Sequence, residues 1–563
     1  MKKKMQQWAA LCLALALAFC LGLPVWAEEP EAYGITLEQK GKIILKWKAG
    51  DTEEKSVTAT AYQVIRVDYD YEGDVPKSPE FYWVDKVAEW VKTSPHSAYI
   101  KQADNSVPET FNDGSVNAED MKKFAGDMAQ AIRGSAITEL ASFSATNTGT
   151  GSITFSGLDM GAYLILLEGG TKIYEPVFVS IVPTWDEHDK TWKLNDLEKN
   201  VTAKSQALTL RKTVFDNQGQ ELVNVDYEDG GSDCAQVKIG DTVTYMLVAD
   251  VPAYPADADN TGYQISDNLP EGMTLNQGSV KVYGLAENTP NVAIGDLLNE
   301  PEDYTLTADN ATRPVTGNLS VTFNLNFTYN AIKDYAKIRV VYTATANENL
   351  KTIGQDNNGD GNVNTAYLDY NNNPYGAGST WETQTGTATV YSYGIMVQKV
   401  DKSNNNPLSG AKFTLKKSGE PSAIQFVGSN GVYRVATAGE SGSSEILAVG
   451  ASEDNMGKLV ISGLDVGIYE LTETKAPDGY IKLTAPVTIT ITDADPNGKV
   501  DDGSASVDGT DGYVELKVEN GKGFTLPSTG GMGTMLFTAI GTVLMGGGLV
   551  LLLLYLRRRN RQE

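Results

Sequence analysis

Residues 457–469 read Gly457-Lys-Leu-Val-Ile-Ser-Gly-Leu-Asp-Val-Gly-Ile-Tyr469, and residues 151–163 read Gly151-Ser-Ile-Thr-Phe-Ser-Gly-Leu-Asp-Met-Gly-Ala-Tyr163. Each copy has an apolar run, a turn with Gly and Asp, and a second run that ends on Tyr. This is the pattern of two strands joined by a tight turn. A repeat of this kind indicates that one structural unit occurs more than once in the chain.

Regions outside the repeat also have strand patterns. Apolar and polar residues alternate in Thr242–Val248, Ser320–Phe327 and Lys337–Thr345, as they do in half-buried strands. We therefore predict an all-β protein of tandem immunoglobulin-like β-sandwich domains. Phe81–Val91 and Ala118–Ile132 instead have helical spacing and few β-branched residues, which predicts helices inserted in the first of these domains.

The strand patterns restart at Leu208 and Ile395, which suggests where domains begin. We expect a signal peptide, three domains and a C-terminal signal, with the bounds 1–27, 28–203, 204–392, 393–525 and 526–563.

The composition of the 563 residues excludes several classes of protein. A net charge of −26 argues against a nucleic-acid binder. Two histidines and three cysteines leave almost no room for a His/Cys zinc site, a disulfide framework or a His-based catalytic triad. Asp356-Gln-Asn-Asn-Asp-Gly361 is similar to the start of a calcium loop, but Tyr367 stands where the bidentate Glu belongs. We predict no metal and no cofactor.

The N-terminus has the features of a secretory signal. Lys2, Lys3 and Lys4 precede the apolar stretch Trp8–Val25, and Val25-Trp-Ala27 is a suitable cleavage site. Cys12 and Cys20 leave with this segment, so Cys234 is the only cysteine of the exported chain and no internal disulfide is possible.

The C-terminus has three parts in order. The pentapeptide Leu526-Pro527-Ser528-Thr529-Gly530 precedes an uncharged stretch, Gly531–Leu556, which is longer than the ~20 residues that span a bilayer. Four arginines follow and favour the inside of the membrane. The order resembles the sorting signal of Gram-positive surface proteins. The resemblance implies that a membrane sortase cuts after Thr529 and that the protein resides at the cell wall.

Three polar residues of the last domain lie in phase with apolar ones. Residues two apart on a strand share a face, so the sequence predicts that each points into the core. Lys399 is in phase with Ile395 and Val397, Glu473 with Tyr469 and Leu471, and Asn520 with Val514, Leu516 and Val518. An ordinary buried ion pair with a hydrogen-bonded asparagine is the alternative explanation.

The same region resembles the B-type repeats of collagen adhesins and the pilin domains built from them. The matching residues are Lys399-Val-Asp401, Gly410-Ala-Lys-Phe413, Tyr469-Glu-Leu-Thr-Glu-Thr-Lys-Ala-Pro-Asp-Gly-Tyr480 and Asn520. The resemblance implies an internal isopeptide bond, with Lys399 as nucleophile, Glu473 as catalyst and Asn520 as electrophile. An apolar site lowers the pKa of a lysine and raises that of a carboxylic acid, so the amine can attack and the acid can shuttle protons.

The middle domain repeats this arrangement with different spacing. Lys212, Asp267 and Asn364 are each in phase with apolar residues, and Ile265–Gly272 and Asn364-Thr-Ala366 resemble the second domain of shaft pilins. The resemblance implies a second bond, from Lys212 to Asn364 with Asp267 as catalyst. We expect both bonds to tie the first strand of a domain to its last. Asn362 and Asn371 remain alternative acceptors.

The first domain departs from the pattern. Aligning the repeat sets Leu167 opposite Glu473, and Glu168 then faces the other way. We predict no isopeptide bond there.

Trp192-Lys-Leu-Asn-Asp-Leu-Glu-Lys199-Asn200 resembles the pilin motif of shaft pilins, although it is shorter and has Glu198 before the lysine. The resemblance implies that Lys199 receives Thr529 of the next subunit; Lys193 and Lys204 compete for this role. We predict a major pilin, a non-enzymatic structural protein. Its partners would be its own copies, a sortase, minor pilins and peptidoglycan. The alternatives are a monomeric wall-anchored adhesin and a wall-anchored hydrolase. The sequence does not identify a host ligand.

Overall fold

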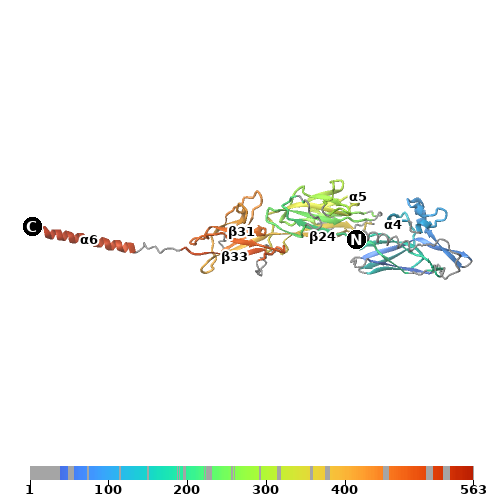
Figure 1. The fold of residues 1–563 in the computed structure, drawn as a ribbon, viewed down its shortest axis with the longest axis horizontal. Helices are drawn as coiled ribbons and strands as arrows, with labels where there is room; N and C mark the ends of the chain where they lie inside the picture. The colour runs from blue at the N-terminus through green and yellow to red at the C-terminus, as the bar shows by residue number, and fades with distance from the viewer. Residues whose placement is uncertain are drawn as a thin grey trace. The chain divides into compact units, whose positions relative to one another are not determined.

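The structure is a computed structural model, and strands are its main regular element (Figure 1). It describes residues 39–47, 56–72, 75–112, 116–148, 151–186, 188, 191–193, 198–220, 222, 231–254, 258, 260–290, 293–313, 319–354, 359–374, 381–447, 456–501, 512–523 and 533–561. The signal peptide at 1–27 and the pentapeptide at 526–530 lie outside these residues. The chain forms two compact units, 1–350 with 360–391 and 351–359 with 392–563. The three predicted domain ranges stay predictions.

The strands before residue 207 pair with one another. One sheet has the order β3-β2-β6-β8 with β4 beside β2, a second has β11-β1-β5, and β7 pairs β12 and β9 pairs β10. Their bounds are β1 Gly41–Lys46, β2 Ser56–Glu72, β3 Val75–Trp83, β4 Ser142–Thr148, β5 Ser152–Leu158, β6 Gly161–Gly169, β7 Ile173–Tyr174, β8 Val177–Ile181, β9 Thr184–Asp186, β10 Thr191–Lys193, β11 Glu198–Thr202 and β12 Ser205–Gln206. One buried apolar cluster takes residues from both main sheets, including Ile43, Ala59 and Ile165.

Helices lie between β3 and β4, as the sequence predicts. They are α2 Asp85–Thr93, η1 Ser97–Tyr99, α3 Glu109–Asn112 and α4 Ala118–Arg133. The predicted helix start at Phe81 is wrong, because Phe81 and Trp83 alternate with Tyr82 on β3 and are buried. The Asn117 side chain caps α4 by accepting from the backbone NH of Glu119 and Asp120.

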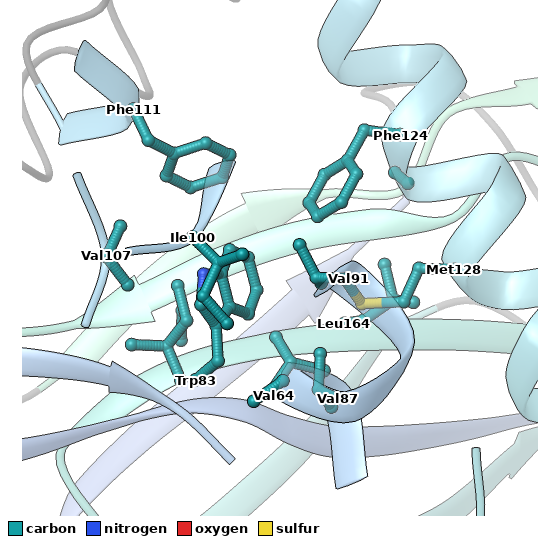
Figure 2. Close-up of a cluster of buried hydrophobic side chains, with 14 of the residues drawn as sticks. Val64, Trp83, Val87, Val91, Ile100, Val107, Phe111, Phe124, Met128 and Leu164 are labelled. Atoms are coloured by element: carbon teal, nitrogen blue, oxygen red, sulfur yellow. The ribbon is translucent and has the colours of Figure 1, made fainter. Parts of the chain in front are cut away.

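A second apolar cluster joins these helices to the sheet (Figure 2). Trp83 from β3 packs edge-on against Phe111 and Phe124, with ring centroids 5.4 and 5.6 Å apart. Val87 and Val91 of α2 and Met128 of α4 belong to the same cluster. The helices therefore have a core of their own on the β2–β6 sheet.

The strands from 210 to 391 form two six-stranded sheets. The first has the order β13-β15-β22-β18-β19 with β17 beside β22, and the second has β14-β24-β23-β16-β21-β20. The bounds are β13 Leu210–Phe215, β14 Cys234–Gln236, β15 Thr242–Asp250, β16 Tyr263–Asn268, β17 Met273–Leu275, β18 Lys281–Leu285, β19 Asp296–Leu297, β20 Tyr304–Thr312, β21 Ser320–Phe327, α5 Tyr329–Ile332, β22 Lys337–Ala346, β23 Asn362–Asn371 and β24 Trp381–Tyr391.

The remaining strands form two further sheets, β27-β28-β30-β25-β33 and β29-β26-β31-β32. Their bounds are β25 Tyr393–Asp401, β26 Lys412–Lys417, β27 Phe426–Ser429, β28 Val432–Val435, β29 Ile446–Leu447, β30 Lys458–Leu464, β31 Gly467–Lys475, β32 Val487–Ile491 and β33 Tyr513–Asn520. The last element is the helix α6, Gly533–Arg559, red in Figure 1. Its part Met535–Arg559 is long and apolar enough to cross a membrane.

Candidate functional sites: two buried lysine clusters

The first cluster lies between the two sheets of the middle region. Lys212 is on β13 in one sheet, while Asp267 on β16 and Asn364 on β23 are in the other. β16 and β23 are neighbours in register Asp267↔Ala366, so the acid and the amide share one sheet face. The exposed fractions of Lys212, Asp267 and Asn364 are 2%, 0% and 0%. The structure thus brings together the three residues that strand parity selects.

Hydrogen bonds connect the three side chains through a tyrosine. Lys212 Nζ donates to Asp267 Oδ2 and to the Tyr342 hydroxyl oxygen, the latter over 3.1 Å. Asn364 Nδ2 donates to the same hydroxyl oxygen over 2.8 Å. Within the described residues, Oδ1 of Asp267 and Oδ1 of Asn364 have no hydrogen-bond partner. A buried amine, a carboxyl and an amide therefore meet at one point.

Burial moves both titrating groups of this cluster toward their neutral forms. Desolvation lowers the pKa of Lys212 to about 8, against the opposing attraction of Asp267. Desolvation likewise raises the pKa of Asp267 above its ordinary value. The lysine also lies beside aromatic rings, with Nζ 5.1 Å from the Tyr245 ring centroid and 5.7 Å from that of Tyr342.

A glycine allows the two sheets to approach at the lysine. A Cβ at Gly386 on β24 would lie 3.2 Å from Lys212 Cβ and 3.3 Å from the Leu210 carbonyl oxygen.

β24 follows the strand that carries Asn364, so the expectation that the middle bond would involve the last strand is wrong. The candidate acceptor lies on the penultimate strand, because β24 extends the sheet beyond it toward β14.

The second cluster lies in the C-terminal unit. Lys399 on β25 and Asn520 on β33 are on adjacent parallel strands, paired Lys399↔Val518 and Asp401↔Asn520. Glu473 is on β31 in the facing sheet. Lys399, Glu473 and Asn520 are 0%, 2% and 1% exposed.

The acid of this cluster contacts the asparagine directly. Asn520 Nδ2 donates to Glu473 Oε2 over 3.0 Å and to the Ile481 carbonyl over 2.6 Å. The Leu483 backbone NH donates to the same Glu473 oxygen over 2.7 Å. Lys399 Nζ donates to the Val518 carbonyl over 2.9 Å, and burial lowers the pKa of Lys399 to about 8. The lysine amine thus contacts the neighbouring strand β33, which ends with the asparagine.

The first domain has apolar residues at the positions equivalent to the lysine and the acid. Leu45 pairs with Ile153 as Val397 pairs with Leu459 in the other copy of the repeat, so Trp47 occupies the place of Lys399. Trp47 packs against the sheet core, with its ring centroid 5.8 Å from that of Tyr174. Leu167 is buried, and the exposed Glu168 faces away from it, with Oε1 3.7 Å from Arg133 Nε. Aligning the repeat predicts Leu167 from the sequence, whereas the place of Trp47 follows only from the pairing of β1 with β5.

The residues of the pilin-like motif are only partly described. Lys199 lies on β11 opposite Ile43 of β1 and is half-buried. Glu198 Oε2 accepts from Lys42 Nζ over 2.9 Å, and this bond holds the pKa of Glu198 below its usual range. Lys204 is exposed. The side chain of Lys193 and residues 194–197 lie outside the described part, as does Thr529.

The structure adds residues that periodicity alone could not assign. Tyr342 is in phase with the apolar Val340 and Ala344 on β22. That pattern marks it as a core aromatic, but nothing in the sequence says that its hydroxyl contacts Lys212 and Asn364. Contacts across two sheets depend on which strands pair, which alternation does not specify.

An acidic cluster follows β32. Single carboxylate oxygens of Asp493, Asp495 and Asp501 lie within 4.8 Å of one another. Asp493 Oδ2 accepts from the Tyr393 hydroxyl over 2.7 Å and from the Gly498 NH over 2.7 Å. Clusters of exposed acids are common without a metal, and the expectation of no metal stays a prediction.

Comparisons with known proteins match the C-terminal part of the chain and the fold. A prealbumin-like fold domain, SpaA, matches residues 394–505, and an LPXTG cell wall anchor motif matches 518–563. The trypsin-resistant surface T6 protein of Streptococcus pyogenes serotype M6 is 25% identical over 457 residues, which are 71% of this chain and 79% of that protein.

Solved pilin structures are also similar. The T6 backbone pilin of serotype M6 Streptococcus pyogenes has a TM-score of 0.51 at 19% identity, covering 86% of this chain and 100% of that one. The major pilin SpaD of Corynebacterium diphtheriae has a TM-score of 0.44 at 18% identity, covering 87% and 99%. The all-β fold and the wall anchor predicted from the sequence are confirmed.

Proposed function

We propose that this chain, a cell-wall-anchored protein of the Gram-positive pilin kind, is the repeating structural subunit of a covalent surface pilus. The observation that carries the proposal is the pair of buried lysine, acid and asparagine clusters in a chain with a backbone-pilin fold and a sorting motif. The only chemistry proposed for the chain is directed at itself. This agrees with relatives that are structural proteins rather than enzymes.

The first part of the proposal is a bond between Lys212 and Asn364. The neutral Nζ attacks Asn364 Cγ, the C–Nδ2 bond breaks, and ammonia leaves. Asp267 in its protonated form polarises the amide carbonyl. The lowered pKa of Lys212 and the raised pKa of Asp267 support these protonation states.

An equivalent bond is proposed between Lys399 and Asn520 with Glu473 as the acid. The hydrogen bond between Glu473 Oε2 and Asn520 Nδ2 supports it, because the acid then touches the leaving nitrogen. Both reactions remove a costly buried charge, since each converts an amine into an amide.

Intact mass measures the two bonds. The measured mass of the wild-type chain should be lower than the mass calculated from its sequence by two ammonia molecules. Asp267→Ala and Glu473→Ala should each reduce this difference by one ammonia. By the chain-entropy argument made for disulfides, each lost bond lowers the free energy of unfolding by about 5 kcal/mol for loops of this length. An unmodified wild-type mass would refute the bonds. A cross-linked tryptic peptide that joins Lys212 to Asn362 or Asn371 would show that this asparagine, and not Asn364, is the acceptor.

The second part of the proposal is the link between subunits. Sortase holds the chain cleaved after Thr529 as an acyl intermediate, and Lys199 of the next subunit attacks it. The half-buried position of Lys199 on β11 suits a lysine held in a fixed place. A head-to-tail contact that does not close into a ring builds a filament.

Immunoblots of boiled wall extracts test the polymer. Wild type should give a ladder and Lys199→Arg a single band at the wall, because Arg keeps the charge but stays protonated. Lys193→Arg and Lys204→Arg are matched controls that should keep the ladder. A ladder lost only with one of these controls would reassign the lysine. A single band from wild type would favour a monomeric adhesin.

A further inference from the structure

Tyr342 occupies the centre of the middle cluster. It lies on β22 opposite Tyr245 of β15 and is fully buried. Its ring stacks on Tyr245 with centroids 5.3 Å apart and 25° between the planes, and it meets Phe323 edge-on at 5.1 Å. Two rings therefore fix the direction in which the hydroxyl points.

The hydroxyl touches both atoms that exchange a proton in the proposed reaction. Its oxygen lies 3.1 Å from Lys212 Nζ, the nucleophile, and 2.8 Å from Asn364 Nδ2, the leaving nitrogen. These are hydrogen-bond distances on both sides. We propose that Tyr342 is a catalytic residue that passes a proton from Lys212 to the departing nitrogen of Asn364. This inference rests on the proposed Lys212–Asn364 bond.

The reaction needs two proton movements. In the first, the lysine ammonium gives a proton to the Asp267 carboxylate, to which it is hydrogen-bonded. In the second, the nitrogen that has attacked Cγ must lose a proton while Nδ2 gains one. Asp267 has taken up a proton by that stage, so the second movement needs a group that gives one proton as it takes another.

Tyr342 can carry out this second proton transfer and keep its own hydroxyl group unchanged at the end. Its oxygen accepts the proton from Nζ as its own proton goes to Nδ2. The C–Nδ2 bond then breaks, ammonia leaves, and the products are a secondary amide, a neutral carboxyl and an unchanged phenol. The phenol of Tyr342 does not need to ionise, which burial opposes by raising its pKa far above the usual value.

The C-terminal cluster provides a contrast inside the same chain. There the carboxylate of Glu473 itself accepts a hydrogen bond from the leaving nitrogen of Asn520. Asp267 also interacts with Asn364 and with the Tyr342 hydroxyl. Among the described residues, however, only the middle cluster has a hydroxyl bonded both to the lysine nitrogen and to the leaving nitrogen. The two clusters thus predict opposite responses to loss of Tyr342.

The test follows both bonds in the full chain after pulsed cell-free synthesis, by mass spectrometry of the two cross-linked peptides over time. Tyr342→Phe should slow the Lys212 bond by ~10²-fold or more, the range typical of a lost general acid–base group. The Lys399 bond should form at the wild-type rate.

Tyr263→Phe is the matched control. It also removes a buried hydroxyl from the middle region, one that donates to the Asp250 carbonyl over 3.1 Å. The control should keep the wild-type rate. Equal slowing by both variants would mean lost packing and would overturn the inference, as would a wild-type rate in Tyr342→Phe. A wild-type chain that never forms the Lys212 bond would instead refute the proposed function.

Discussion

At the scale of single residues, two buried cations of the middle region differ in what they can do. Arg313 makes two hydrogen bonds to Asp369, at 2.9 and 2.6 Å, and its guanidinium lies 4.0 Å from the centroid of the Tyr367 ring. A guanidinium stays protonated in proteins, so this pair remains an ion pair. The pKa of Lys212 is instead lowered to about 8, and only the lysine can become a nucleophile.

A carboxylate beside the C-terminal cluster links pH to stability. Asp401 Oδ1 accepts from the Ser403 hydroxyl and NH over 2.7 and 2.8 Å, and Oδ2 accepts from the Tyr480 hydroxyl over 2.8 Å. These bonds lower the pKa of Asp401 from 3.8 to about 2. An acid with a lowered folded pKa stabilises the fold above its unfolded pKa, and the effect is lost as the pH falls.

We therefore predict that Asp401→Asn destabilises the C-terminal unit at neutral pH and that the difference from Asp401 closes between pH 3.8 and about 2. Calorimetry in the Glu473→Ala background, where we expect no bond to form, measures this difference at each pH. Asp478→Asn is the control, because that side chain is 94% exposed, and it should show no such closure. A gap between the Asp401 forms that stays constant down to pH 2 would contradict the prediction.

At the scale of strands, the sequence predicts which residues face the core but not which strands meet. Period-two alternation placed Lys212, Asp267 and Asn364 among apolar neighbours, and all three are buried. The alternation carries no information on pairing between distant strands, so the contacts of Tyr342 could not be predicted. The predicted helix start at Phe81 is wrong for a related reason. Phe81 fits both the helical period and the strand period, and it lies on a strand because β3 pairs with β2.

The two copies of the repeat show how one scaffold can carry a cluster or lack it. In both, the first strand pairs antiparallel with the first strand of the repeat and parallel with a strand near the end of the region. β1 pairs in this way with β5 and β11, and β25 with β30 and β33. Trp47 fills with an indole the space that Lys399 occupies in the other copy. The fold therefore needs a side chain that fills the position of Trp47 and Lys399, but it does not need a cross-link there.

At the scale of the whole molecule, the proposed bonds determine which segments carry a pulling force. A bond from Lys399 to Asn520 leaves residues 400–519 inside a closed loop that force bypasses. A bond from Lys212 to Asn364 protects 213–363 but leaves 365–391 in the path. That segment includes β24, which is held by β23 and β14.

We predict that a chain pulled from its two ends lengthens in the middle region only by the release of 365–391, at most roughly 95 Å at ~3.5 Å per residue. Lys212→Ala should instead release 212–391, at most roughly 630 Å. Single-molecule force spectroscopy separates these steps, and the C-terminal domain, whose bond closes on its last strand, is the internal reference that should not lengthen. A wild-type step of roughly 70 Å would place the acceptor at Asn371, because only 372–391 would then lie outside the loop. A step as long as that of Lys212→Ala would show that no bond shields the middle region from force.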